Sequence, residues 1–263
     1  QKMLDALPYS LTEGQAKAVA EIEADLAAPT RMLRLLQGDV GAGKTVVGLM
    51  AVAAAVESGA QAVMMAPTEI LARQHYLSLA PLCEAAGIRI AVLTGKDGAK
   101  SRRETRAALE AGDIDLIVGT HALFQGDIAF ANLGLAIVDE QHRFGVHQRL
   151  QLSSKGAGVD MLVMTATPIP RTLVLTYFGD MDVSRLTEKP AGRQPIKTVT
   201  VPLERMDEVV ERLRRALDEG TKAYWVCPLV EESEKSDLAA AEERFEVLTQ
   251  VFGPRVALVH GRM

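Results

Sequence analysis

The chain has 263 residues, of which 48% are hydrophobic, and 34 acidic against 29 basic residues give it a net charge of −5 at pH 7. This length suffices for one large domain, or for one domain and part of another. The acidic balance excludes a protein coated in basic surface, although backbone amides and helix N-termini can still hold nucleic-acid phosphates. No apolar run approaches the roughly 18 residues that a bilayer span requires, so we expect no membrane contact.

Residues 1–5 do not resemble a signal peptide and begin without an initiator Met, so we expect an internal segment of a longer protein. After a helical stretch at Glu13–Leu26, short apolar runs and helical patterns alternate. The runs lack a polar–apolar alternation, which is typical of strands buried on both faces of a parallel sheet. The predicted strands are 32–36, 62–66, 88–93, 116–118, 135–138 and 161–165, and the predicted helices between them are 46–56, 71–86 and 100–111. This order predicts a doubly wound α/β fold with a mainly parallel sheet.

Proline, glycine and charged residues cluster at 188–195, where no periodic apolar pattern continues. We interpret this segment as a linker between two domains, residues 1–190 and 191–263. A second β-α-β pattern follows it, and three strands with two helices are few for an independent core, so we expect this domain to be truncated. The predicted elements are strands 198–201, 223–227 and 256–259, a helix at 205–217, an acidic loop at 231–237 and a helix that ends near residue 252.

Residues 38–45, Gly-Asp-Val-Gly-Ala-Gly-Lys-Thr, fit the phosphate-binding loop pattern G-x-x-x-x-G-K-[ST]. Gly38, Gly41 and Gly43 let the backbone curl so that its N–H groups point at phosphate oxygens. Lys44 is expected to reach the β- and γ-phosphates of ATP, and the Thr45 hydroxyl to ligate Mg²⁺. An ordinary glycine-rich turn is the alternative, but the preceding strand and the following apolar helix favour a nucleotide site.

An acidic pair, Asp139 and Glu140, follows the apolar run at 135–138. The predicted strand delivers Asp139 to its carboxyl end, where open α/β sheets bind ligands. We expect Asp139 to hold Mg²⁺ through water, and Glu140 to orient or deprotonate the water that attacks ATP. Acidic pairs after strands are often only turn residues, but a phosphate loop upstream favours the catalytic interpretation.

Residues 139–142, Asp-Glu-Gln-His, resemble motif II of the superfamily 2 helicases, and further motifs of that superfamily follow in order. Residues 11–15 resemble the Q motif, which implies that Gln15 reads adenine through its amide. Residues 66–74, 93–95 and 119–121 resemble motif Ia, the following glycine motif and motif Ib. Hydroxyl and N–H groups at such strand ends can grip a nucleic-acid backbone without reading its sequence. The implied DNA contacts are Pro67, Thr68, Arg73, Thr94, Gly95, Thr120 and His121.

Residues 165–168 resemble motif III, which links the ATP state to the grip on the strand. The resemblance implies coupling roles for Gln141, Thr165, Thr167 and Arg171. It also implies that His142 acts in catalysis, by connecting the γ-phosphate to motif III. The histidines and the two cysteines show no zinc-ligand spacing, and Cys83 and Cys227 read as reduced thiols of a cytoplasmic protein.

Longer matches at 38–45, 139–146, 165–173, 179–184 and 259–263 resemble the RecG branch-migration helicases. The resemblance implies an ATP-dependent DNA helicase or translocase that uses ATP and Mg²⁺ and acts on stalled forks and Holliday junctions, in replication restart and recombinational repair. We also expect a monomer, with single-strand-binding protein as a partner. Because motifs V and VI and an arginine finger are not matched, we expect this chain to bind ATP or ADP, to hydrolyse ATP slowly and to unwind nothing alone.

Three alternatives remain open. The transcription-repair coupling translocases share the stretch Ile-Pro-Arg-Thr-Leu at 169–173, although Gln141 and His142 lean toward RecG. A P-loop kinase or metabolic NTPase would act without nucleic acid, and a nucleotide-dependent switch would release a partner on hydrolysis. Neither of these last two classes predicts motifs Ia, Ib and III.

Overall fold

A computed structural model describes residues 2–120, 123, 128–139, 158–167, 181–188, 196–227 and 234–259, with backbone only for 234–240. The chain divides into two compact units, Gln1–Arg193 and Gln194–Met263. Across these described ranges, every helix is too short or too polar to cross a membrane.

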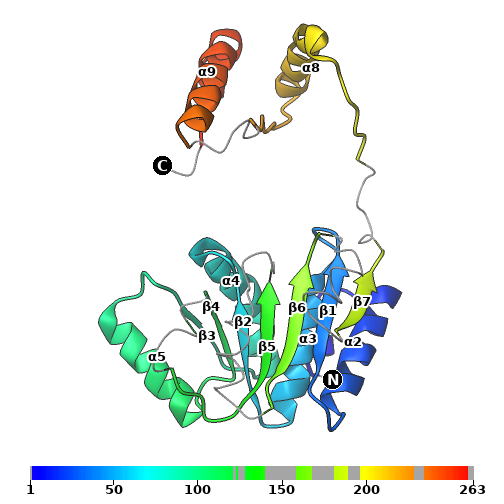
Figure 1. Cartoon of the computed structure of the whole chain (residues 1–263), viewed down its shortest axis with the longest axis vertical. Coiled ribbons are helices and arrows are strands. Elements are labelled where there is room, and N and C mark those ends of the chain that lie inside the picture. The colour runs from blue at the N-terminus through cyan, green and yellow to red at the C-terminus, as the bar shows by residue number, and fades with distance from the viewer. Residues whose placement is uncertain are drawn as a thin grey trace. The chain divides into compact units, whose positions relative to one another are not determined.

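The first unit is built on a seven-stranded sheet in which each pair of neighbouring strands runs parallel (Figure 1). The strand order is β3-β4-β2-β5-β6-β1-β7. The strands are β1 (Leu33–Gly38), β2 (Gln61–Met65), β3 (Ile90–Leu93), β4 (Leu116–Gly119), β5 (Leu133–Asp139), β6 (Asp160–Thr165) and β7 (Asp182–Leu186). The predicted α/β class with a parallel sheet is therefore confirmed, and the ends of the first six strands lie within two residues of their predicted positions. Strand β7 was not predicted, because its sequence, Asp-Val-Ser-Arg-Leu, mixes charged and apolar residues at the sheet edge.

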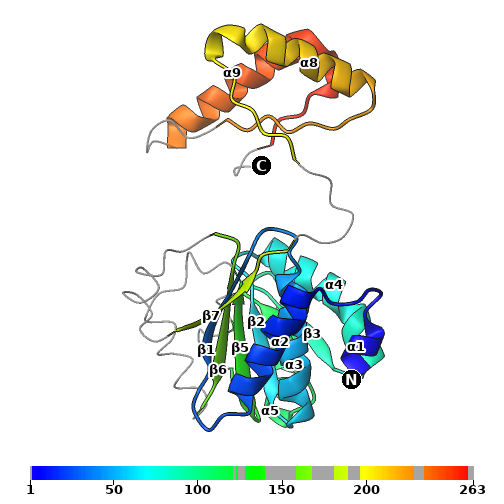
Figure 2. The same ribbon diagram turned by 90° about the vertical axis from the view of Figure 1, so that its right-hand side faces the viewer.

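Helices α2, α3 and α4 cover one face of this sheet (Figure 2). Helix α2 begins at a capping box, in which the Thr12 hydroxyl accepts from the Gln15 N–H at 3.3 Å and the Gln15 carbonyl Oε1 accepts from the Thr12 N–H at 3.0 Å. Helix α4 begins after Thr68, whose hydroxyl accepts from the Leu71 N–H at 3.3 Å. The helices in the described part of the unit are α1 (Lys2–Ala6), α2 (Glu13–Leu26), α3 (Lys44–Glu57), α4 (Glu69–Ala86) and α5 (Ala99–Ala111).

The core lies on both sides of the sheet, because successive strand residues point to opposite faces. Leu36, Met64 and Ile137 belong to the cluster beneath α2, α3 and α4. Their neighbours, such as Leu35 and Val63, belong to a second cluster on the other face, which includes Leu109 of α5. Burial on both faces explains why the strand sequences are continuously apolar.

The second unit contains the helices α8 (Met206–Asp218) and α9 (Glu234–Phe252) and two short 3₁₀ turns, η3 (Leu203–Arg205) and η4 (Gly253–Arg255). The two predicted helices are confirmed, but the predicted strands at 198–201, 223–227 and 256–259 do not form. The predicted acidic loop was also wrong from Glu234 onward, where α9 begins; residues 231–233 lie outside the described ranges.

These strands fail because a strand needs a hydrogen-bonded neighbour, and β-propensity mostly reflects packing on a paired, half-buried surface. No strand pairing involves the described residues of the second unit, and Val199, Tyr224, Val226 and Val259 are all exposed. Trp225 therefore does not lie on a strand. Instead, the guanidinium of Arg244 on α9 lies over its ring, 5.5 Å from the centroid.

Candidate functional site

The predicted phosphate-binding loop connects the end of β1 at Gly38 to the start of α3 at Lys44. Gly41 and Gly43 have φ angles of 81° and 84°, in the left-handed region that side chains other than glycine rarely adopt. The Lys44 ammonium donates hydrogen bonds to the carbonyls of Gly38 at 2.7 Å and Asp39 at 3.1 Å. The loop therefore places a positive charge and the amino-terminal end of a helix together, an arrangement that suits a phosphate group.

The side chain of Gln15 joins helix α2 to this loop through a hydrogen bond. Its side chain is buried, and its Nε2 donates to the carbonyl of Ala42 at 2.9 Å, while its Oε1 accepts from Thr12. An amide has two N–H donors and two acceptor lone pairs, so one of each remains available for a base. Reading of adenine by Gln15 stays a prediction. A shallow hollow of about 630 Å³ opens beside the start of this helix, lined by Leu4, Leu7, Pro8, Tyr9, Ser10, Leu11 and Ala16.

Asp139 is the last residue of β5. Figure 1 shows the carboxyl ends of β5 and β1 on the same edge of the sheet. Strand β6 separates β5 from β1, and all three run parallel, so their carboxyl ends meet at one edge. The register pairs Asp139 with Met164 and Gln37 with Thr165. The sheet thus brings Lys44, Thr45 and Asp139 to one edge, as the motif interpretation requires.

Thr165 and Thr167 lie between these two halves of the site. Thr165 is fully buried, and its hydroxyl lies 3.0 Å from the Thr167 hydroxyl and accepts from the Thr167 N–H at 3.2 Å. The side chain of Gln37, at the end of β1, donates to the Thr167 carbonyl at 3.3 Å. The segment predicted to couple the ATP state to the hold on DNA is therefore hydrogen-bonded directly to β1, which leads into the phosphate-binding loop.

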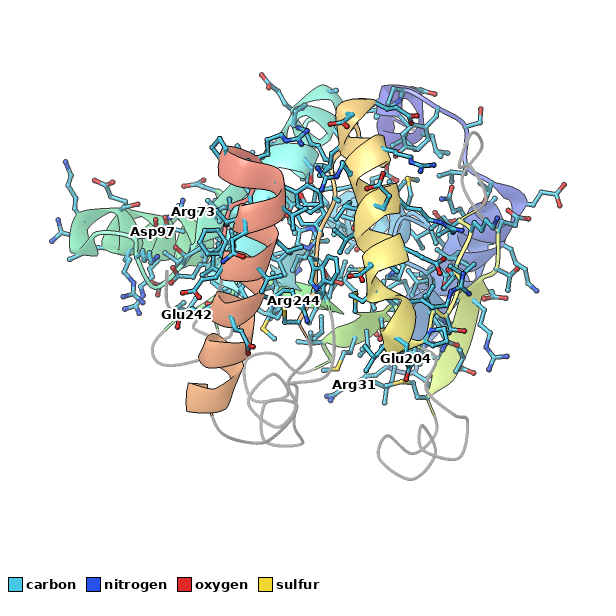
Figure 3. All side chains as sticks on the ribbon, turned by 90° about the horizontal axis from the view of Figure 1, so that it is seen from above. Arg31, Arg73, Asp97, Glu204, Glu242 and Arg244 are labelled. Atoms are coloured by element: carbon cyan, nitrogen blue, oxygen red, sulfur yellow. The ribbon has the colours of Figure 1, made fainter. Side chains whose placement is uncertain are left out.

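Arg73 and Thr94, two of the predicted DNA contacts, form one cluster with Asp97, beside which Arg73 lies in Figure 3. The Arg73 guanidinium donates to Asp97 at 2.7 Å and to the Thr94 hydroxyl at 3.1 Å. Asp97 also accepts from the N–H and hydroxyl of Thr94, at 2.6 and 3.0 Å. Burial alone would raise the pKa of Asp97, but the hydrogen bonds from Thr94 and Arg73 outweigh it and hold this pKa below its ordinary value. Sequence reasoning missed Asp97, although its place three residues after Thr94 suits a local side-chain-to-backbone bond.

The remaining predicted DNA contacts differ in exposure. Thr68 and Gly95 are exposed, and Pro67 is half-buried, on the edge where β2 and β3 end. Thr94 and Thr120 are buried, so a DNA backbone could reach the cluster through Arg73 and Gly95 before it reached either hydroxyl. Of the other predicted site residues, Glu140, Gln141, His142, His121 and Arg171 lie outside the described residues.

His75 is a site residue that sequence reasoning did not find. Its Nε2 lies 2.8 Å from Oδ2 of Asp139, and the two side chains are only 14% and 15% exposed. The residues are 64 positions apart in the chain, so no local pattern could indicate the contact. Helix α4, which begins with motif Ia, therefore touches the predicted metal ligand.

Mg²⁺ as the bound metal stays a prediction. Within the described ranges, no three or more His, Cys, Asp or Glu side chains are grouped as metal ligands. Mg²⁺ usually takes one or two protein oxygens and completes its shell with water and substrate phosphates. The Thr45 hydroxyl and the Asp139 carboxylate fit that requirement at one edge of the sheet.

A parallel sheet with a phosphate-binding loop and an acidic strand end on one edge is the arrangement of a P-loop nucleotide-binding domain. Residues 12–175 match the DEAD/DEAH box helicase family, and the chain belongs to this family.

The match to RecG helicases extends over the whole chain. The chain is 47% identical to the ATP-dependent DNA helicase RecG of Bacillus subtilis and 49% identical to that of Acidithiobacillus ferridurans, over 100% of its own length. It spans only 39% of the length of each relative. A solved structure of RecG bound to a three-way DNA junction superposes with a TM-score of 0.77 and 41% identity, over 94% of this chain and 32% of that one. The predicted resemblance to RecG is confirmed.

Proposed function

We propose that this chain is the ATP-binding motor portion of an ATP-dependent DNA helicase or translocase that acts on branched DNA. Stalled forks and Holliday junctions in replication restart and recombinational repair are the proposed setting. The observation that carries the proposal is the placement of Lys44, Thr45 and Asp139 on one sheet edge, with the Thr165–Thr167 turn between them. The names of the RecG relatives, and the three-way junction bound in one of them, support the choice of substrate.

In this proposal, residues 1–190 are the first motor lobe and residues 191–263 are the amino-terminal part of the second. The protein acts in the cytoplasm as a monomer, and single-strand-binding protein is a further partner. These assignments rest on the resemblance to RecG rather than on a contact in the structure.

The residues at the sheet edge divide the chemistry between them. The N–H groups of the loop and the Lys44 ammonium bind the phosphates, and release of Lys44 from the Gly38 and Asp39 carbonyls frees its charge for them. Thr45 and Asp139 hold Mg²⁺, which when bound neutralises charge on the phosphates. Glu140 orients the attacking water, and Gln15 positions the base.

The DNA-binding residues lie at the ends of neighbouring strands on the same edge. Thr68 and Arg73 follow β2, and Gly95 follows β3. An exposed arginine and exposed strand ends suit contacts with phosphates, which do not depend on base sequence.

The first experiment tests the nucleotide site in this chain. Lys44→Ala should weaken binding of a fluorescent ADP analogue by about 10-fold or more, because a charge-assisted hydrogen bond contributes about 1.5–3 kcal/mol. Lys17→Ala is the control, since the side chain of Lys17 is 79% exposed on α2 and should leave the affinity unchanged. Equal affinities for both variants and the unmodified chain would contradict a phosphate-binding role.

The second experiment tests the motor function. This chain replaces the matching segment of the Bacillus subtilis RecG helicase, to which it is 47% identical. We expect the chimaera to hydrolyse ATP faster when a three-way DNA junction is added, and Lys44→Ala to abolish that stimulation. A chimaera that binds ATP normally but does not respond to any DNA would contradict the proposal.

A further inference from the structure

The contact between His75 and Asp139 joins a ring nitrogen to a carboxylate oxygen, with Nε2 of His75 2.8 Å from Oδ2 of Asp139. In the tautomer whose Nε2 carries the hydrogen, His75 donates to this oxygen. Both side chains are largely buried, so water competes little for this bond. In the described part of the chain, His75 is the side chain that hydrogen-bonds Asp139, and Oδ1 stays available for another ligand.

We propose that His75 is a positioning residue, which fixes the Asp139 carboxylate for Mg²⁺ and ties it to the helix that holds the DNA backbone. The proposal rests on the proposed function, because it takes Asp139 as the metal ligand and α4 as a DNA-binding helix. A carboxylate held at one oxygen loses its rotational freedom and presents the other oxygen in a fixed orientation. Outer-shell partners of this kind typically change metal affinity by 10- to 100-fold when they are removed.

The bond between His75 and Asp139 also links the predicted metal site to the predicted DNA-binding cluster, because α4 contacts both. Strand β2, which leads into α4, is the direct neighbour of β5, and Met65 pairs with Val138 one residue before Asp139. The same helix carries Arg73, two residues before His75, and Arg73 reaches across to Thr94 and Asp97. One rigid helix therefore contacts the predicted DNA-binding cluster and the predicted metal ligand at once.

Two sites joined through one rigid element influence each other's affinity, and the influence is reciprocal. In this proposal, DNA that displaces Arg73 from Asp97 shifts α4 as a whole, and His75 moves with the helix. The orientation of Asp139 then depends on whether DNA is bound. Metal–nucleotide binding should in turn change the affinity of the chain for DNA.

The first test measures metal affinity without catalysis. Binding of Mn²⁺, a spectroscopic substitute for Mg²⁺, is titrated by electron paramagnetic resonance on the whole chain with saturating ADP. We expect His75→Ala to weaken Mn²⁺ binding by about 10-fold, and His75→Gln, which keeps an N–H donor, to recover most of the loss. Leu77→Ala, an exposed position on the same helix, should change nothing. All variants should bind ADP equally in the absence of metal.

Asp139→Ala distinguishes a failure of the positioning role of His75 from a failure of the proposed metal site. If it weakens Mn²⁺ binding and His75→Ala does not, or if His75→Gln gives no recovery, the positioning role is wrong while the metal site stands. If Asp139→Ala itself leaves Mn²⁺ binding unchanged, the proposed metal site is wrong and the positioning role falls with it.

The second test measures the coupling. The dissociation constant of a fluorescent three-way DNA junction is determined with and without Mn²⁺ and ADP, and the ratio of the two values is compared between variants. We expect a ratio different from one in the unmodified chain, a ratio near one for His75→Ala, and recovery for His75→Gln. A ratio of one in the unmodified chain, or the same ratio in His75→Ala, would overturn the link through α4.

Discussion

Replacing Gly43 by alanine tests whether the phosphate-binding loop is built around Gln15. Gly43 has a φ of +84°, and a Cβ added there would clash with Nε2 of Gln15. Gly59 offers a matched control, since its φ is +82° but a Cβ there meets nothing within 4 Å. Both substitutions place alanine at nearly the same positive φ, and only the first forces the Gln15 amide to move.

The structure gives a magnitude for each variant. Alanine in the left-handed conformation costs about 1–2 kcal/mol, and this term applies to both positions. Displacing Gln15 also breaks its 2.9 Å hydrogen bond to the Ala42 carbonyl, inside a buried contact. Leaving such a group unsatisfied costs a further 1–3 kcal/mol, roughly. Gly43→Ala should therefore lower the free energy of unfolding by about 2–5 kcal/mol, and Gly59→Ala by about 1–2 kcal/mol.

Urea denaturation followed by far-ultraviolet circular dichroism measures these differences. Tryptophan fluorescence is unsuitable, because the single Trp225 lies in the second unit. Gln15→Ala removes the clashing amide, so Gly43→Ala made in that background should cost no more than Gly59→Ala. Equal losses for Gly43→Ala and Gly59→Ala in the unmodified background, or a loss that Gln15→Ala does not relieve, would refute the reasoning.

Three further predictions concern the described residues away from the loop. Arg34→Met removes a buried guanidinium 2.6 Å from Asp25 and leaves a partly buried carboxylate unpaired. The free energy of unfolding of the first unit, measured in urea, should fall by about 2–3 kcal/mol, and no change would contradict this. The pKa of Asp97 is lower in the folded than in the unfolded chain, so the ionised Asp97 stabilises the fold fully above about pH 4. This stabilisation is lost as the pH falls through the pKa of the folded state. The free energy of unfolding measured against pH should show the loss, and Asp97→Asn should reduce it. Burial, with a smaller effect of a nearby carboxylate, raises the pKa of Cys83 to about 11. Iodoacetamide should therefore label the half-exposed Cys227 in the native chain, and Cys83 only after unfolding. Mass spectrometry of the labelled chain checks this.

The sheet of the first unit could be predicted because its strands are buried on both faces. Continuous apolar runs such as that of β5 leave few alternatives to a central parallel strand. Strand β7 could not be recognised in this way, since Asp182 and Arg185 are exposed at the edge and the strand exists through its pairing with β1. The strands expected in the second unit failed for the converse reason: Tyr224 and Val226 have the propensity but no paired neighbour.

The local parts of the site were predictable, whereas its long-range contacts were not. Lys44 and Thr45 follow from one contiguous motif, because the loop conformation is specified by its own glycines. The bond from His75 to Asp139 depends on β2 lying next to β5, and strand order is not encoded in any short stretch of sequence. The same holds for Gln15, which resembles a base-reading residue in sequence but in the structure first serves to join α2 to the loop.

The strand order also bears on the choice between a motor and a P-loop enzyme that acts without nucleic acid. If the helicase-like matches were accidental, they would fall on both edges of the sheet. Instead, the matches that border β1 to β6 in the described ranges lie at the end of the strand and not before its start, and in a parallel sheet these carboxyl ends form one continuous edge; the match at 179–184 is the exception, since it overlaps the start of β7. Strands β5, β6 and β1 supply the nucleotide half of that edge, while β2, β3 and β4 supply the half predicted to hold DNA. Since β2 and β5 are neighbours, the two halves adjoin at Asp139 and α4, which is where a motor needs its ATP site and its DNA grip to communicate.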